Sequence, residues 1–145
     1  MPESGEVIEV SEENMPAIVI TSNREQELPT AFKGRCIYHY IHFPEPEMMK
    51  EIVAKHHPKI DDKVVQVASD IFYHLRNLGL ERAPTTRELL NWLKYAKQYS
   101  SEEAIEKIKK LEGVGALIKT QSDLEKVQKL ILQNPDDFSK RSLAN

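Results

Sequence analysis

Three polar residues of this chain have the type and position that phosphate chemistry would need, and the first of them is Asn23. It comes just after a short apolar run at residues 16–21, Pro-Ala-Ile-Val-Ile-Thr. An Asn at the carboxyl end of a buried strand can orient a water molecule or contact a phosphate. The same residue type also suits an ordinary turn at a strand end. Both interpretations of Asn23 stay open from the sequence alone.

The other two residues are arginines. Arg35 stands between Gly34 and a second apolar stretch, and a guanidinium in such a place can bind a phosphate, even one held by a neighbouring subunit. Arg87 falls in the first turn of a helix that Thr85 would cap. A cation there opposes the helix dipole, at a cost on the order of a few tenths of a kcal/mol, and a bound anion would reverse the sign. The alternative for each is a solvated surface arginine.

Two further patterns resemble known sites but lack the required geometry. Cys36, His39 and His42 have the spacing C-x-x-H-x-x-H. On a strand, however, His39 points to the opposite face from the other two, so no zinc site is predicted. The run from Gly113 to Thr120 lacks the glycine that a phosphate loop places before its lysine. We interpret it as a loop between helices.

Two strands and a series of helices would position these residues. Residues 16–21 are continuously apolar, which is typical of a strand buried on both faces, and residues 36–43 are rich in aromatic and β-branched types. Helical spacing then begins at Pro46 and continues to Pro135. Capping signals at Asp61 or Asp62, Thr85, Ser100 and Ser122 predict where the later helices begin. The predicted fold class is therefore mostly α with a small α/β part, divided into residues 1–44 and 45–145.

Composition narrows the function classes. The 145 residues carry a net charge of −3, and residues 1–15 contain five Glu but no Lys or Arg, so that tail alone carries −5. This balance argues against a nucleic-acid or anionic-membrane partner. No apolar run approaches the roughly 20 residues of a membrane span. One cysteine, Cys36, fits a reducing cytoplasmic location.

The three weak signals occur together in an order that resembles a known family. The segments PAIVITSN, ELPTAFKGRCIYHYIHFPEPEMMKEIV and APTTRELLNWL resemble AAA+ ATPases of the MoxR-like, dynein-related group. The resemblance extends from about residue 3 to residue 98, and more loosely to about 132. It implies that Asn23 is the sensor-1 residue, Arg35 the arginine finger and Arg87 the sensor-2 residue of a helical lid domain.

The resemblance also implies what the chain lacks. The family's phosphate loop and its magnesium-binding acidic strand would be expected before residue 1, so we expect a partial, truncated or split AAA+ subunit that does not catalyse alone. In a complete module, ATP and magnesium would be the cofactors and hydrolysis would remodel partner proteins. The implied partners are other AAA+ subunits or a complementary fragment, and von Willebrand factor A-domain proteins. The alternative is a stand-alone helical interaction module that uses residues 45–145 as its binding surface and binds no nucleotide.

Overall fold

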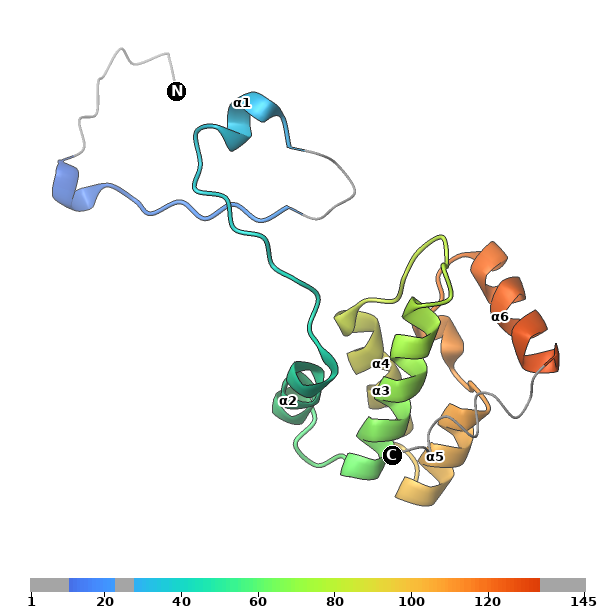
Figure 1. The fold of residues 1–145 in the computed structure, drawn as a ribbon. Helices are drawn as coiled ribbons and strands as arrows, with labels where there is room; N and C mark the ends of the chain where they lie inside the picture. The colour runs from blue at the N-terminus through green and yellow to red at the C-terminus, as the bar shows by residue number, and fades with distance from the viewer. Residues whose placement is uncertain (1–10, 23–27, 134–145) are drawn as a thin grey trace, which may run out of the picture. The chain divides into compact units, whose positions relative to one another are not determined.

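The computed structural model describes residues 11–22 and 28–133, and the chain divides into two compact units, Met1–Ile41 and His42–Asn145. Within the described ranges there are six α-helices and two short 3₁₀ helices (Figure 1). None of these helices is both long and apolar enough to cross a membrane. The mostly helical part of the predicted fold class is confirmed for this portion of the chain.

The first unit corrects the prediction of two strands. Its described part contains the 3₁₀ helix η1 (Glu12–Asn14) and the short helix α1 (Thr30–Lys33), but residues 16–21 and 36–43 form no strand. Ile18 and Val19 are 77% and 86% exposed, and Ile37 is fully exposed. Apolar, β-branched side chains favour a strand only when neighbouring strands accept its backbone hydrogen bonds. No such ladder exists among the described residues, so the two stretches remain irregular.

The second unit opens with two helices that the sequence signals define well. Helix α2 (Pro46–His56) begins with Pro46, whose fixed φ suits the first helical position, and it ends shortly before Pro58. Helix α3 (Asp62–Arg76) is capped by Asp61, whose Oδ1 accepts a hydrogen bond of 2.8 Å from the Lys63 N–H. Pro46 and the Asp61 cap thus define where α2 and α3 begin.

Helices α4 (Thr86–Ala96) and α5 (Ser101–Lys109) both begin at a capping box, as predicted. The 3₁₀ helix η2 (Val114–Ala116) follows, and then helix α6 (Gln121–Gln133). The prediction that Ser122 caps the last helix is wrong. The hydroxyl of Thr120 accepts a hydrogen bond of 3.2 Å from the Asp123 N–H, so Thr120 takes the capping role and the helix begins before Ser122.

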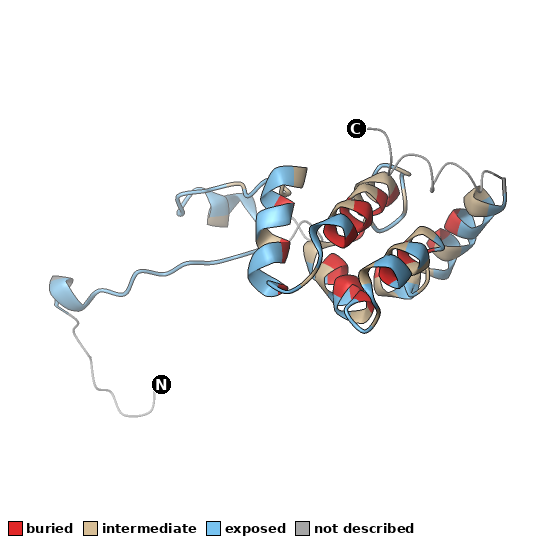
Figure 2. Ribbon diagram, turned by 90° about the horizontal axis from the view of Figure 1, so that it is seen from below, coloured by how far each residue is buried: buried red, intermediate tan, exposed pale blue. Residues whose placement is uncertain are grey.

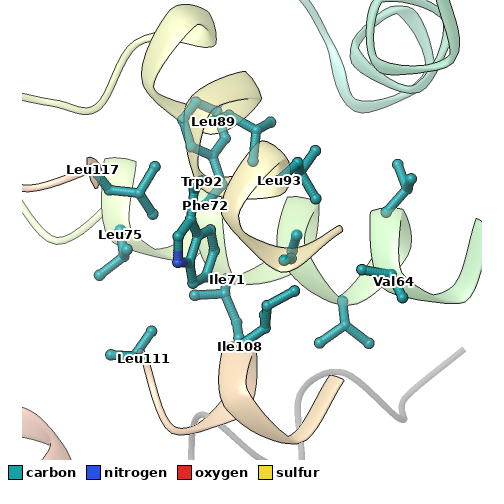
Figure 3. Packing of buried hydrophobic residues seen from close by; sticks show 14 of the residues in the cluster. Val64, Ile71, Phe72, Leu75, Leu89, Trp92, Leu93, Ile108, Leu111 and Leu117 are labelled. Carbon is teal, nitrogen blue, oxygen red and sulfur yellow. The ribbon is translucent and has the colours of Figure 1, made fainter. Parts of the chain in front are cut away.

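Helix α3 lies at the centre of the second unit and contacts α2, α4 and α5. The buried residues form one side of each helix, and the exposed residues form the other (Figure 2). Trp92 and Phe72 are the largest fully buried side chains, and they lie among leucines and isoleucines from several helices (Figure 3). The Trp92 Nε1–H donates a 2.8 Å hydrogen bond to the Glu112 carbonyl, which satisfies the one polar atom of the indole.

Two contacts at the edge of this core involve the turn at Gly113 and the segment just before α2. Gly113 has a φ of +72°, and a Cβ added there would lie 3.2 Å from the ring of Tyr95, so this turn requires glycine. At the start of the unit, the Tyr73 hydroxyl donates a 2.7 Å hydrogen bond to the Pro44 carbonyl. Phe43 stacks on Phe72 with 6.1 Å between ring centroids. Phe43 and Pro44 therefore belong to the helical unit, although the sequence suggested a boundary just after them.

Candidate functional site

The beginning of α4 is the most highly organised polar region of the second unit, and the Glu88 carboxylate is its centre. Glu88 Oε2 accepts hydrogen bonds from the Thr85 N–H at 2.8 Å and from the Thr85 hydroxyl at 3.0 Å. Glu88 Oε1 accepts a hydrogen bond of 2.6 Å from Arg82 Nη1. Burial raises the pKa of Glu88, but the hydrogen bonds from Arg82 and Thr85 outweigh it, and the net shift is downward.

Arg76 holds the loop before α4 in place. Its Nη1 donates a hydrogen bond to the Pro84 carbonyl. Its guanidinium carbon lies 3.4 Å from the ring centroid of Phe43, within the range of a cation–π contact. Burial lowers the pKa of Arg76, since removing water disfavours the charged form. This side chain therefore supports the loop and is not open to a ligand.

Helix α6 is joined to the same loop through Asp123. The two carboxylate oxygens of Asp123 accept hydrogen bonds from the Glu81 N–H at 2.8 Å and from the Arg82 N–H at 3.1 Å. Desolvation raises the pKa of Asp123, yet the hydrogen bonds from Glu81 and Arg82 give a net lowering. Nearby, Lys126 Nζ donates to the carbonyls of Leu78 and Gly79, each at 2.9 Å. The loop between α3 and α4 is thus fixed from both sides.

Arg87 lies in the first turn of α4, as the sequence predicted, and the hydrogen bonds described above hold this end of the helix in place. It is exposed, and within the described residues its guanidinium has no hydrogen bond or ion pair. Glu88 and Leu89 donate their N–H groups to the Thr85 carbonyl. In that same part of the chain, the N–H groups of Thr86 and Arg87 have no backbone acceptor. A cation and two N–H groups at a helix N-terminus can bind an anion such as a phosphate.

The structure does not test whether the three candidate residues share one site. Arg35 belongs to the first unit, directly after α1, where it is exposed and its N–H donates a 3.1 Å hydrogen bond to the Phe32 carbonyl. Asn23 lies outside the described residues. Arg87 belongs to the second unit. The assignment of these residues to a common site therefore stays a prediction.

Two residues of this region could not be identified from the sequence. Arg82 carries no local pattern that marks it as the partner of Glu88, although the spacing from Thr85 to Glu88 did identify the capping box. Asp123 accepts from residues 41 and 42 positions earlier in the chain, and such a distant contact leaves no local signal. Among the described residues, no group of three His, Cys, Asp or Glu side chains could hold a metal ion.

Comparison with known proteins adds no relative: no protein family, curated protein or solved structure matches this chain.

Proposed function

We propose that residues 45–145 act as the helical lid of an AAA+-type nucleotide-binding module, with Arg87 as its phosphate-contacting residue. The observation that carries this proposal is the exposed Arg87 side chain, without a partner among the described residues, on a rigidly supported helix N-terminus. A cation at this end of a helix is unfavourable in the absence of an anion. A bound phosphate would offset both the dipole and the unpaired N–H groups of Thr86 and Arg87.

The roles of the remaining residues follow from the resemblance. In a complete module, Asn23 would orient the attacking water, and Arg35 would reach the nucleotide of the neighbouring subunit. Magnesium and the phosphate loop would be supplied outside this sequence, since no Gly-Lys pair suited to a phosphate loop occurs in it. ATP hydrolysis in such an assembly would drive remodelling of partner proteins, with von Willebrand factor A-domain proteins as one class. The chain alone should therefore show no magnesium-dependent ATPase activity.

The test is an NMR titration of the ¹⁵N-labelled chain with magnesium-ATP. We expect weak, millimolar binding that shifts the amide signals of residues 86–88 and the side-chain signal of Arg87. Arg87→Ala should remove these shifts. Lys94→Ala, which removes an exposed cation from the last turn of the same helix, is the matched control and should leave them unchanged. Shifts that are absent at 20 mM nucleotide, or that survive in Arg87→Ala, would count against the lid assignment.

A second candidate function is an interaction module without nucleotide. The observation that favours it is the group of exposed apolar side chains in the first unit, which includes Ile18, Val19, Ile37 and Ile41. Such side chains commonly mark a surface that a partner protein covers. The nucleotide titration separates the two functions, because an interaction module would give no shifts at the beginning of α4.

A further inference from the structure

An open depression of about 470 Å³ lies where α2 turns into α3, in the second unit. Its apolar lining includes Ala54, Ile60 and Val65. The volume falls in the range of small-ligand sites. The depression contains neither Arg87 nor any residue that contacts Glu88, so it is separate from the region proposed to meet nucleotide.

His57 is the most informative polar residue of this lining. It is only 9% exposed, and its Nε2 lies 2.9 Å from the Leu90 carbonyl oxygen. A carbonyl can only accept, so Nε2 carries the proton, and in the neutral ring Nδ1 holds a lone pair. In the described part of the chain, Ser69 Oγ is the only fully buried side-chain nitrogen or oxygen without a hydrogen-bond partner. Nδ1 of His57 is not among such buried atoms and has no hydrogen-bond partner in the same part of the chain, so it is accessible as an acceptor.

The other polar residues of the depression supply acceptors, and the donors among them are Lys50 and the second N–H of the Gln66 amide. The amide Nε2 of Gln66 donates a 2.8 Å hydrogen bond to Asp70, so its oxygen remains available. Glu51 and Asp62 are exposed carboxylates, and neither forms an ion pair within the described residues. Lys50 is the only cation that lines the depression. Residues with two carboxylates, an imidazole lone pair and an amide oxygen thus line the depression together with apolar side chains.

We propose that this depression binds an arginine side chain of a partner polypeptide. The apolar lining suits the methylene stem of an arginine, and the acceptors suit its guanidinium, which has five N–H donors and no acceptor. The carboxylates of Glu51 and Asp62 supply the opposite charge, and His57 Nδ1 supplies a further acceptor. The buried histidine is independent of the acidic pair, because its orientation is set by the Leu90 carbonyl. The proposal does not depend on nucleotide binding.

The test is an NMR titration of the full chain with N-acetyl-arginine-methylamide, with the uncharged citrulline analogue as the reference probe. Binding should shift the signals of Glu51, His57 and Asp62. The double variant Glu51→Gln, Asp62→Asn should weaken it about fivefold, the size expected for two partly exposed ion pairs. Glu47→Gln removes the same charge from an exposed position on α2 outside the depression, and should leave the affinity unchanged. Lys50→Met should tighten binding, because it removes the competing cation.

Several outcomes would overturn the proposal. One is the absence of localised shifts up to 100 mM probe while the amide spectrum shows an intact fold. Another is equal affinity for the arginine and citrulline probes, which would mean that charge plays no part. A third is weaker binding of the arginine probe in Lys50→Met, which would mean that Lys50 does not compete with a bound guanidinium and that the charge argument is wrong.

Discussion

Replacing Glu88 tests how much its hydrogen bonds stabilise the beginning of α4, where Arg87 lies. The Glu88 carboxylate accepts three hydrogen bonds, at 2.8 and 3.0 Å from Thr85 and at 2.6 Å from Arg82. Loss of a helix cap costs about 1 kcal/mol. The Arg82 side chain is 42% exposed, so its ion pair falls in the surface class and adds up to about 1 kcal/mol. Glu88→Ala should therefore lower the free energy of unfolding by about 2 kcal/mol, and Glu88→Gln, which keeps a neutral acceptor, by about 1 kcal/mol.

The contribution of Glu88 to the free energy of unfolding should depend on pH in a definite direction. The folded-state pKa of Glu88 lies below the ordinary glutamate value of 4.5, because the hydrogen bonds from Arg82 and Thr85 outweigh the effect of burial. A carboxyl with a lowered folded pKa contributes stability above its unfolded pKa, and loses it as the pH falls through the folded value. The difference between wild type and Glu88→Gln should be complete at pH 7 and should shrink below about pH 4.5.

Urea unfolding, followed by far-UV circular dichroism and by the fluorescence of Trp92, measures these differences. Trp92 is the only tryptophan and is buried in the core, so its emission reports on the helical unit. Glu106→Ala removes an exposed glutamate from α5 and is the matched control, with an expected change of less than about 0.5 kcal/mol. A Glu88→Ala effect no larger than that of Glu106→Ala would refute the reasoning. The reasoning would also be refuted if the difference in unfolding free energy between wild type and Glu88→Gln stayed the same below about pH 4.5.

Three further predictions concern the edges of the helical unit. Gly113→Ala should lower the melting temperature by several degrees, because φ is +72° and the new Cβ would press on an aromatic ring, whereas Gly115→Ala, with open space around it, should have little effect. Phe43→Ala should destabilise the unit by about 1–2 kcal/mol in urea unfolding, because it removes an aromatic stack and the cation–π contact with Arg76. Asp123→Ala should speed amide hydrogen exchange in α6 more than in α3; equal rates in both helices would contradict the assigned tie.

The helices were predictable because their signals are local. Asp61, Thr85 and Ser100 are each followed by the helix that their side chains suggest, and the apolar spacing identified the buried faces. The prediction of strands was wrong because strand formation is not local. Residues 16–21 have the composition of a strand, but a strand forms only beside a partner strand, and a local sequence pattern does not show whether one is present. Arg87 was placed correctly in its helix, whereas its support by Asp123 arises only in three dimensions.

The attachment of α6 has a consequence for the order in which the unit folds. Asp123 bonds the backbone of Glu81 and Arg82, across 42 and 41 residues of chain. Closing so long a loop is entropically unfavourable until the intervening helices have condensed. The carboxylate also needs both N–H groups already held in the same turn. Docking of α6 is therefore a late event in folding, and this helix should be the first to detach when the native state fluctuates.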